Sequence, residues 1–591
     1  MTILNESMRE TLSQSLFDNA AEDNFKSTSI HKDIGNISYL KGSQKEPLIY
    51  TTIGKIFSKT VEKFGPREAA IFVDQNMRLT YYDLDREVDR LAGGLLSLGL
   101  KTGDRVGIWS PNRYEWLVTQ FATAKIGLIL VNINPAYRLT ELEYALNKVE
   151  CKALILAPQF KSSNYIEMIQ TLIPELEQSE STKFTSAKIP SLNYIISMGD
   201  SVNKGILGFD QVCKMAAPAH KIMINKIANR LDPDDAINIQ FTSGTTGTPK
   251  GATLSHYNIL NNANFVTQTM QFSENDILCI PVPLYHCFGM VMGTLGCVVR
   301  GSKMVFPSEA FDATSCLNAI EQEKCTALYG VPTMFVSLFS DASFKTRDYS
   351  SLRTGIMAGA LCPIEVMNRA VNEMNLAQIT ICYGMTETSP VSFQTHVNTP
   401  LDKRVSTVGL VHPQLEVKVI DEAGKTVAIG EKGELCTRGY SVMLGYWGDT
   451  ETTNSAIDAS RWMHTGDLAV FDKQNYCTIV GRIKDMIIRG GENIYPKEIE
   501  DFLFKHDAII NVQIFGVHSD QYGEEVCAFI TSKDGSVLKQ EDVKAFCKGQ
   551  IAHYKIPKYI KFVNEMPMTV TGKPQKFVMK DMMEKELNIT Y

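Results

Sequence analysis

The sequence lacks the cysteine and histidine patterns of disulfide-rich and metal-binding proteins. None of its 13 cysteines forms a Cys-x-x-Cys pair, and its 10 histidines are isolated from one another. The odd cysteine count argues against a complete disulfide framework and favours a reducing compartment. Structural zinc needs paired cysteine and histidine ligands, so the sequence predicts no metal cage.

An excess of positive charge and long apolar runs are also missing. The net charge is −7 and the pI is near 5.9, so no basic field is available for nucleic acid, and small-molecule chemistry is the better expectation. The longest apolar run, residues 288–299, holds about a dozen residues with three glycines. Because a membrane span needs roughly 20 apolar residues, we predict no transmembrane segment. No oligomeric state follows from these patterns.

The first 45 residues are polar, and we expect them to be disordered. They contain acidic residues, which mitochondrial transit peptides usually avoid. Among these acids are Glu6, Glu10, Asp18, Glu22 and Asp23. The composition of this segment therefore gives little support to a mitochondrial address and leaves a cytoplasmic one open.

What is present is a regular alternation of β-branched runs and helical patterns, which predicts an α/β fold with mainly parallel sheets flanked by helices. Residues 105–109 read as a strand, 115–125 as a helix and 128–133 as the next strand. A chain of 591 residues exceeds one hydrophobic core, so we expect several subdomains. A charged, glycine-rich stretch near residue 484 predicts a joint, with a large domain over 46–483 and a small, mobile α+β domain over 484–591.

The strongest local motif is the stretch from Thr242 to Gly251, TSGTTGTPKG, which follows the strand-like residues 236–241. Its glycines let backbone N–H groups approach anionic oxygens, its hydroxyls donate hydrogen bonds and Lys250 adds a compact charge. Such stretches are often mere surface turns. Here the whole pattern predicts a polyphosphate site. The expected nucleotide-binding residues are Thr242, Ser243, Gly244, Thr245, Thr246, Gly247, Thr248, Pro249 and Lys250.

A Walker A loop does not fit, because Pro249 and Gly251 occupy positions that must be Gly and Ser or Thr. The ten residues instead resemble the phosphate loop of the acyl-adenylate-forming superfamily, which includes acyl-CoA synthetases, firefly-type luciferases and peptide-synthetase adenylation domains. The resemblance extends over about residues 45–585. It implies ATP and Mg²⁺ as cofactors.

Further motifs of this superfamily follow in order. Residues 383–388, YGMTET, resemble the second nucleotide motif. This resemblance implies that Glu387 holds Mg²⁺, a hard cation that prefers carboxylate oxygens, and that Thr386 faces the α-phosphate. Taken alone, Glu387 would be read as a surface acid.

The remaining motifs imply contacts to the nucleoside. Gly359 and Ala360 resemble the stretch that holds adenine against the ring of Tyr383. The sequence HTGD, ending at Asp467, resembles the ribose motif, in which one carboxylate accepts two hydroxyl hydrogen bonds. Arg482, fifteen residues later, matches the arginine beside the ribose and phosphates.

Three residues are implied in the chemistry and its motion. Lys573, in the motif PMTVTGKPQK, matches the catalytic lysine that stabilises charge on pyrophosphate. Lys484 matches the hinge about which the small domain rotates. His286 matches the histidine that borders the acyl site. The apolar run of residues 290–299 is either a wall of that site or a buried core helix, and residues 331–333 are a candidate for the opposite wall.

Within the superfamily, residues 233–260, 131–137 and 141–144 resemble the medium-chain acyl-CoA synthetases of animals. This resemblance implies a fatty acid substrate, coenzyme A as co-substrate and a mitochondrial address. An aryl-acid or luciferase-like enzyme would share the nucleotide motifs and differ in its acyl pocket. An inactive nucleotide-binding scaffold is the other alternative, and the presence of Lys573, Glu387 and Asp467 argues against it.

Overall fold

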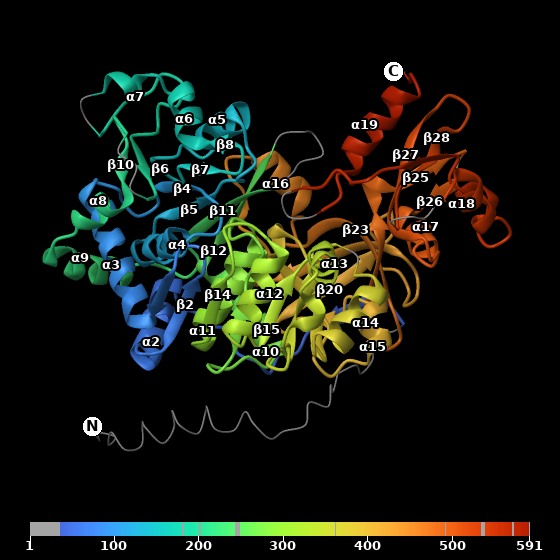
Figure 1. The fold of residues 1–591 in the computed structure, drawn as a ribbon, viewed down its shortest axis with the longest axis horizontal. Helices are drawn as coiled ribbons and strands as arrows, with labels where there is room; N and C mark the ends of the chain where they lie inside the picture. Colours follow the sequence, from blue (N-terminus) through green and yellow to red (C-terminus); the bar gives the residue numbers. More distant parts are fainter. Residues whose placement is uncertain are drawn as a thin grey trace. The chain divides into compact units, whose positions relative to one another are not determined.

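The computed structural model describes residues 36–179, 182–199, 203–242, 249–360, 362–490, 492–533, 538–569 and 573–589. The chain divides into two compact units, Met1–Ile37 and Ser38–Tyr591. Every element below belongs to the second unit (Figure 1). Residues 243–248 of the predicted phosphate loop lie outside the described residues.

Two large sheets dominate the second unit. The first has eight strands in the order β10-β9-β6-β4-β5-β11-β12-β22, and the second has nine in the order β19-β18-β17-β16-β15-β13-β14-β2-β3. The strands of the first are β4 (Arg105–Trp109), β5 (Ile129–Asn132), β6 (Ala153–Leu156), β9 (Tyr194–Ser197), β10 (Leu207–Gly208), β11 (Ala236–Thr242), β12 (Lys250–Ser255) and β22 (Gly445–Tyr446). The strands of the second are β2 (Glu68–Phe72), β3 (Met77–Thr80), β13 (Ile277–Cys279), β14 (Lys303–Phe306), β15 (Ala327–Gly330), β16 (Thr354–Ala358), β17 (Gln378–Gly384), β18 (Val391–Gln394) and β19 (Leu410–Val411). The central pairs of both sheets are parallel, which confirms the predicted α/β class.

Two smaller sheets consist mainly of strands from the later part of the sequence. The third sheet is antiparallel, in the order β1-β20-β21-β23-β24, and the fourth has the order β26-β25-β28-β27 with β29 beside β28. Their strands are β1 (Tyr39–Lys41), β20 (Leu415–Ile420), β21 (Gly433–Gly439), β23 (Met463–Phe471), β24 (Cys477–Arg482), β25 (Ile487–Arg489), β26 (Glu492–Ile494), β27 (Ile509–Ser519), β28 (Gly523–Ser532) and β29 (Tyr559–Phe562); β7 (Gln159–Phe160) and β8 (Ser163–Asn164) form a separate hairpin. Strand β1 corrects our expectation of disorder through residue 45, because Tyr39–Lys41 pairs with β20.

Helices cover the sheets and connect their parallel strands. They are α2 (Ile53–Phe64), α3 (Tyr81–Ser97), α4 (Tyr114–Ile126), α5 (Leu139–Lys148), α6 (Tyr165–Leu172), α7 (Glu175–Gln178), α8 (Phe209–Lys214), α9 (Pro218–Ala228), α10 (His256–Thr269), η1 (Phe288–Leu295), α11 (Gly296–Arg300), α12 (Ala313–Gln322), α13 (Pro332–Ser340), η2 (Phe344–Thr346), α14 (Ile364–Glu373), η3 (Thr386–Thr388), α15 (Leu401–Ser406), α16 (Thr450–Ala456), η4 (Ile483–Asp485), α17 (Pro496–Leu503), α18 (Gln540–Cys547), η5 (His553–Lys555) and α19 (Lys576–Glu586). No described helix combines the length and apolar composition that crossing a bilayer requires.

The unit β4-α4-β5 shows how the sequence specifies these connections. Helix α4 is buried from Glu115 to Ile126, so neighbouring elements cover it on nearly every side. It ends at Gly127, whose φ of 69° is left-handed, a conformation that glycine adopts without a Cβ clash. Strand β5 then pairs in parallel with β4. The predicted strand, helix and turn are confirmed at this place.

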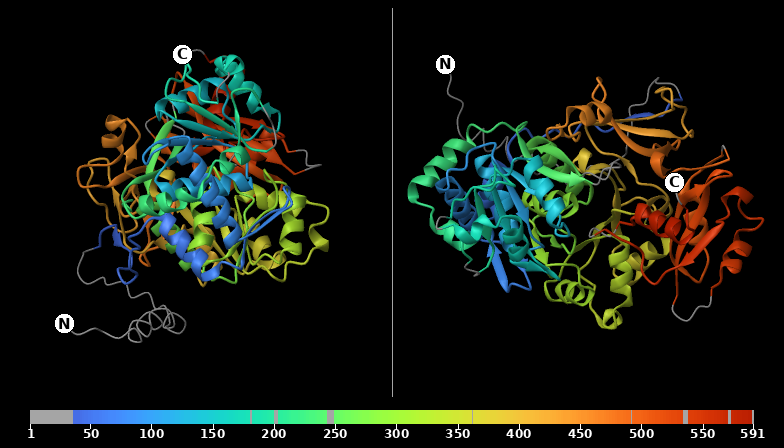
Figure 2. Two further views of the ribbon diagram at one scale, coloured as in Figure 1. Left: turned by 90° about the vertical axis from the view of Figure 1, so that its left-hand side faces the viewer. Right: turned by 90° about the horizontal axis from the view of Figure 1, so that it is seen from above.

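The predicted joint at residue 484 lies between the third and fourth sheets, in η4. In Figure 1, the red strands after this point and α19 lie beside orange segments and away from β2 and β4, and the right-hand view of Figure 2 agrees with this. The fourth sheet has its own core, which includes Ile487, Ile514, Val526 and Ile560. The division into domains at residue 484 stays a prediction. The separate core of the fourth sheet is consistent with it.

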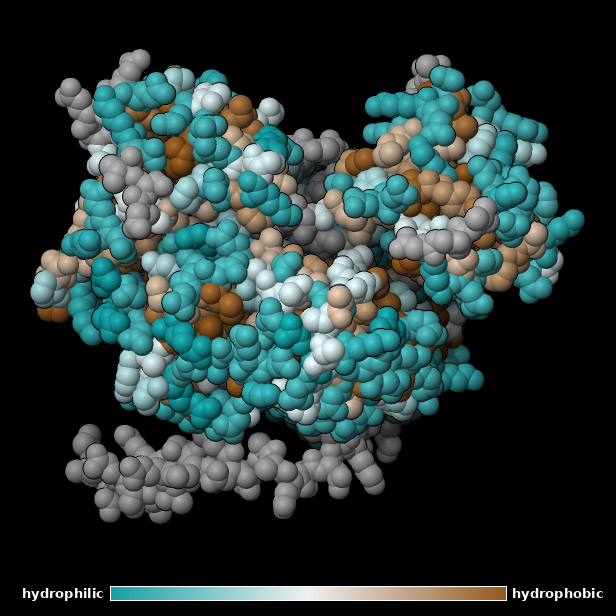
Figure 3. Space-filling model, viewed as in Figure 1, coloured by the Kyte–Doolittle hydropathy of each residue, from teal (hydrophilic) through white to brown (hydrophobic). Residues whose placement is uncertain are grey.

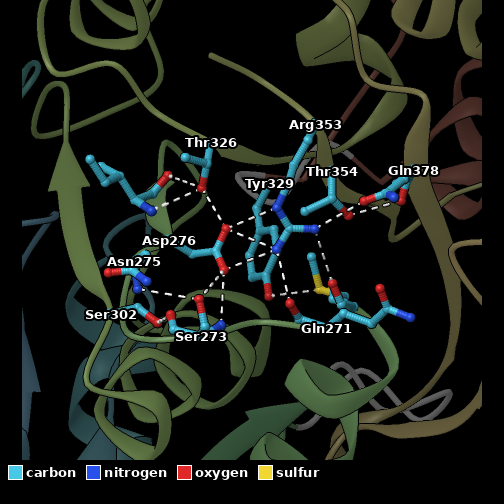
Figure 4. A network of polar contacts seen from close by, with 12 residues as sticks. Gln271, Ser273, Asn275, Asp276, Ser302, Thr326, Tyr329, Arg353, Thr354 and Gln378 are labelled. Atoms are coloured by element: carbon cyan, nitrogen blue, oxygen red, sulfur yellow. Dashed lines mark hydrogen bonds and ion pairs between the residues drawn. The ribbon is translucent and has the colours of Figure 1, made fainter. Parts of the chain in front are cut away.

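A buried ion pair ties the amino ends of four neighbouring strands in the second sheet (Figure 4). Asp276, next to β13, accepts hydrogen bonds from both Thr326, next to β15, and Arg353, next to β16. The Arg353 Nη2 atom lies 2.8 and 2.9 Å from the two carboxylate oxygens, and its Nη1 donates to Gln378 at the start of β17. Asp276 is only 4% exposed, so its charge depends on these partners.

We expect Asp276→Ala to lower the free energy of unfolding by about 3 kcal/mol, because it leaves the Arg353 charge without its partner. The value lies at the low end of the range for buried pairs because the Arg353 side chain is 33% exposed. Urea denaturation of both proteins measures the loss. Glu373→Ala is the control, since it removes a carboxylate from the exposed Arg369–Glu373 pair and should cost less than about 1 kcal/mol.

Candidate functional site

The candidate site lies at the carboxyl ends of the parallel strands, where open α/β sheets bind their ligands. Thr242 is the last residue of β11, Gly359 follows β16, and Tyr383 is the next-to-last residue of β17. Segments after the ends of β4, β13 and β15 supply the residues of a cavity. Two sheets thus present their loops to one region, while the ion pair of Asp276 lies at the opposite edge of the second sheet.

Glu387 is the carboxylate at the centre of this region. It lies in η3 and is 5% exposed. Its Oε1 atom accepts hydrogen bonds from Thr242 Oγ1 at 3.1 Å and from Tyr446 OH at 2.9 Å. Burial and the neighbouring Glu387 charge raise the pKa of Tyr446, so the phenol stays protonated as a donor. Tyr446 was not predicted, and the aromatic pair after Gly445 was the only signal for it.

Asp467 forms a second polar centre with two of the other predicted residues. Its Oδ2 accepts a hydrogen bond of 2.6 Å from Tyr383 OH, and its Oδ1 lies 2.9 Å from Arg482 Nε. Asp467 and Arg482 are register partners in β23 and β24, which explains their contact across fifteen residues of sequence. Burial and the Asp467 charge hold the pKa of Tyr383 well above its usual value.

Lys573 lies within electrostatic reach of both centres. Burial lowers the pKa of its ammonium, and the positive charge of Arg482 lowers it further, while the carboxylates of Glu387 and Asp467 act in the opposite direction. All three residues are therefore close enough to act electrostatically on Lys573. The backbone around Lys573 is fixed by Thr569, whose hydroxyl accepts from the Lys573 N–H at 2.9 Å.

His286 lies beside the lysine and is uncharged. Burial lowers its pKa to about 3, and the Lys573 charge contributes in the same direction. The N–H of Phe288 donates to His286 Nδ1 at 3.2 Å, so a neutral ring carries its proton on Nε2. The next residue, Cys287, donates to Gln240 Oε1, and burial raises the pKa of its thiol to about 12. Cys287 is thus a packed thiol and not a nucleophile at neutral pH.

The other predicted residues lie around these centres. Gly359 has a φ of 91° and leaves an exposed backbone with Ala360 directly after β16. The ammonium of Lys250 lies 5.3 Å from the centre of the Tyr446 ring. Lys484, in η4, has a pKa lowered by burial and by Arg482. Pro249 precedes β12, and Thr386 is buried next to Glu387.

A cavity of about 240 Å³ is lined by Pro283 and Tyr285, which come just before His286 in the sequence, and by Thr569, four residues before Lys573. Residues of the large sheets line it together with Thr569, and its lining includes Val331 and Thr333 from the segment proposed as a wall of the acyl site. Its lining also includes Pro111, Asn112, Pro283, Tyr285, Phe311 and Met334. Figure 3 shows the surface hollowed between the part that carries α5 and α6 and the part that carries α19.

The apolar run of residues 290–299 does not line this cavity. It forms the end of η1 and most of α11, and its residues from Met290 to Val298 are buried in the main core. Of the two interpretations that the sequence left open, the structure supports the buried core helix. A π-helical stretch such as η1 was not predicted, because its widened turns leave no mark on an apolar run.

Comparison with known proteins places this site in context. Residues 57–447 match the family model of the AMP-binding enzymes, and residues 498–573 match that of the AMP-binding enzyme C-terminal domain. The chain is 46% identical to the medium-chain acyl-CoA ligase ACSF2, mitochondrial, of Danio rerio, over 93% of this chain and 91% of the relative. It is 44% identical to the protein of the same name from Homo sapiens, over 94% and 91%.

Solved structures give the same result for the fold. The anthranilate CoA ligase AuaEII in complex with anthranoyl-AMP superposes with a TM-score of 0.80 at 25% identity, covering 92% of this chain and 99% of that one. The two family models include the positions of Glu387 and Lys573.

Proposed function

The chain belongs to the AMP-binding enzyme family and is an AMP-forming acyl-CoA synthetase, and from this premise we propose that it activates medium-chain fatty acids through the residues described above. The enzyme converts a carboxylate and ATP into an acyl-adenylate and pyrophosphate. It then transfers the acyl group to coenzyme A and releases AMP. The observation that carries the residue assignment is that the charges of Glu387 and Asp467, from separate parts of the sequence, both act on the ammonium of Lys573.

The nucleoside part of ATP is assigned to the second polar centre. Asp467 accepts hydrogen bonds from the ribose hydroxyls, and these replace the hydrogen bond that it accepts from Tyr383 OH in the unliganded protein. Adenine lies between the ring of Tyr383 and the exposed backbone of Gly359 and Ala360. Arg482 holds the carboxylate in place and faces the phosphate side. These assignments are supported by the short distances among Tyr383, Asp467 and Arg482.

The phosphates and Mg²⁺ are assigned to the first centre. Glu387 is buried, and no ion pair between described residues includes it, so its charge is available to a cation. Together with the phosphate oxygens it forms the hard oxygen donor set that Mg²⁺ prefers. When bound, the ion neutralises charge on the triphosphate. Thr386 faces the α-phosphate, and the segment from Thr242 to Lys250 holds the others.

Charge and geometry then favour transfer of the adenylyl group from ATP to the carboxylate, with pyrophosphate as the leaving group. The ammonium of Lys573 stabilises negative charge that grows on the departing pyrophosphate. The ring of His286 borders the acyl group and is neutral. It therefore does not form an ion pair with the substrate carboxylate, which stays available to attack the α-phosphorus of ATP. The alkyl chain occupies the 240 Å³ cavity, whose prolines, Phe311 and Met334 suit an apolar tail.

The thiol of coenzyme A must then reach an acyl carbonyl that the Lys573 segment covers. We infer that residues 484–591 rotate about Lys484 against the large domain of residues 46–483. The location of Lys484 in a one-turn helix between two sheets supports this hinge, since a single residue there can change dihedral angles without disrupting a strand.

A mass-spectrometric assay tests the substrate class. Purified protein is incubated with Mg-ATP, coenzyme A and carboxylic acids from C2 to C18, and AMP and acyl-CoA are followed. We expect AMP and thioester in equal amounts, with a maximum at medium chain length. A maximum on aryl acids would overturn the fatty-acid assignment, and the absence of both products would favour an inactive scaffold.

The compartment is a separate proposal. We propose a mitochondrial location, because both ACSF2 relatives are named as mitochondrial proteins. A fusion of the first 45 residues to a fluorescent protein tests it. Uniform cytoplasmic fluorescence of the fusion, together with that of the full chain, would favour the alternative address.

The Tyr446 hydroxyl gives a test of the metal assignment. We expect Tyr446→Phe to lower kcat/KM for ATP in pyrophosphate exchange about tenfold, because a hydrogen bond to a charged group is lost. The Mg²⁺ concentration for half-maximal exchange should rise with it. Tyr440→Phe is the control, since among the described residues the Tyr440 hydroxyl has its hydrogen bond with Asn262 in the core. An unchanged Mg²⁺ dependence would contradict the proposed place of the ion.

A further inference from the structure

The loop that carries Asp467 is a bulge in strand β23. Glu434 of β21 pairs with Leu468, and Cys436 pairs with His464, so three residues of β23 face the single residue Leu435. Gly466 lies at the apex of the bulge with a φ of 70°. A bulge of this kind redirects a side chain away from the regular alternation of the strand. Here it directs the Asp467 carboxylate toward Tyr383 and Arg482.

The bulge is held from the neighbouring strand by Glu434. One carboxylate oxygen, Oε1, accepts a hydrogen bond from the Gly466 N–H at 3.1 Å. The other, Oε2, lies 2.9 Å from His464 Nδ1. Both carboxylate oxygens of Glu434 therefore have a partner in the bulge: Gly466 at its apex, and His464 two residues before it. A charged acceptor makes such bonds stronger than a neutral one would.

Thr465 fixes the same bulge from inside. Its hydroxyl donates to the Leu435 carbonyl at 2.6 Å and accepts from the Asp467 N–H at 3.1 Å. The backbone on both sides of Gly466 is therefore tied to β21, by Thr465 and by Glu434. The side chain of Asp467 has little freedom to turn away from the nucleotide centre.

We propose that Glu434 is a positioning residue for ribose recognition, which acts through the Gly466 N–H and fixes the direction of the Asp467 carboxylate. This inference rests on the proposed contact between Asp467 and the ribose hydroxyls. Glu434 itself touches no substrate. Its loss leaves the bulge free to adopt other conformations, only some of which present Asp467 to the ribose, so nucleotide affinity falls while chemistry on bound ATP continues.

Glu434, Cys436 and His464 also form a group whose ligand atoms lie within 4.8 Å of one another, close enough to share a metal ion. The hydrogen-bonded interpretation accounts for the arrangement without an ion. Glu434 already has a partner at each oxygen, and His464 Nδ1 is 3.7 Å from the Cys436 sulfur. The group therefore supports the positioning role.

Pyrophosphate exchange with ATP and with 2′,3′-dideoxy-ATP tests the proposal, because the analogue lacks the hydroxyls that Asp467 would bind. We expect Glu434→Ala to raise KM for ATP about tenfold with kcat changed less than about threefold. KM for the dideoxy analogue should stay nearly constant, so the preference for ATP collapses. Glu434→Gln should restore most of the preference, since its amide oxygen can accept from Gly466.

Three further variants make the outcome decisive. Glu416→Ala is the matched control, because it removes a paired carboxylate from β20 of the same sheet and should leave the preference intact. Glu434→Asp, whose shorter side chain withdraws from Gly466, replaces the alanine variant if that protein does not fold. Asp467→Ala must abolish the preference by itself. If it does not, the ribose assignment fails independently of Glu434.

The positioning role is overturned if the alanine and aspartate variants keep the wild-type preference for ATP over the analogue while Asp467→Ala loses it. Equal losses for both nucleotides would also overturn it, because they would show a general weakening of the fold. Thermal unfolding of each variant separates that case from a selective effect on the ribose.

Discussion

Lys573→Ala is expected to slow acyl-adenylate formation on the order of 10²–10³-fold, the range for loss of one positioned charge in a transition state. Burial and the Arg482 charge both lower the pKa of the Lys573 ammonium, so the charged form is destabilised in the unliganded enzyme. The phosphates of ATP stabilise it when they bind. Adenylation builds negative charge on pyrophosphate at the moment of cleavage. Lys573 therefore acts more strongly in the transition state than on bound ATP.

Separate assays of the two half-reactions measure this effect. Pyrophosphate exchange should show the full loss, while thioester formation from supplied acyl-adenylate and coenzyme A should stay within about threefold of wild type, since no pyrophosphate is present in that step. Lys585→Ala removes an exposed ammonium from α19 and serves as the control. Equal losses in both half-reactions would show that Lys573 supports the fold or the acyl group and not the departing pyrophosphate.

The sequence predicted those parts of the structure that depend on local patterns. Strand β4, helix α4 and the glycine that ends it follow from apolar runs and one left-handed position. The structure also brings together Thr242 with Glu387, and Tyr383 with Asp467 and Arg482. Their roles toward ATP stay predictions, and residues 243–248 of the loop lie outside the part of the chain that the structure describes.

Other features depend on register between distant strands and could not be predicted. Tyr446 reaches Glu387 because β22 pairs with β12, a pairing of two residues with no sequence signal of its own. Glu434 meets Gly466 only because β23 is bulged opposite β21. Strand β1 is three residues within a polar segment, and it forms because β20 offers it a free edge.

Lys484→Pro is expected to separate the two half-reactions in the opposite direction. Proline holds φ near −65°, which suits the one-turn helix η4 in the present arrangement and excludes the dihedral change of a hinge. Pyrophosphate exchange should therefore stay within about threefold of wild type. Thioester formation should fall on the order of 10²-fold, because the coenzyme A thiol would meet its carbonyl in an unproductive geometry.

Lys484→Ala distinguishes the backbone from the charge. Burial and the neighbouring charge of Arg482 lower the pKa of Lys484, so the two positive side chains repel each other. Alanine removes the Lys484 charge and leaves the dihedral angle φ free. A true hinge predicts near-normal thioester formation in the alanine variant and a block in the proline variant. If both variants lose thioester formation equally, the charge of Lys484 is what matters. If the proline variant keeps both half-reactions, rotation takes place elsewhere in the chain, and the flanking glycines Gly481 and Gly490, with φ of 156° and 59°, become the residues to test.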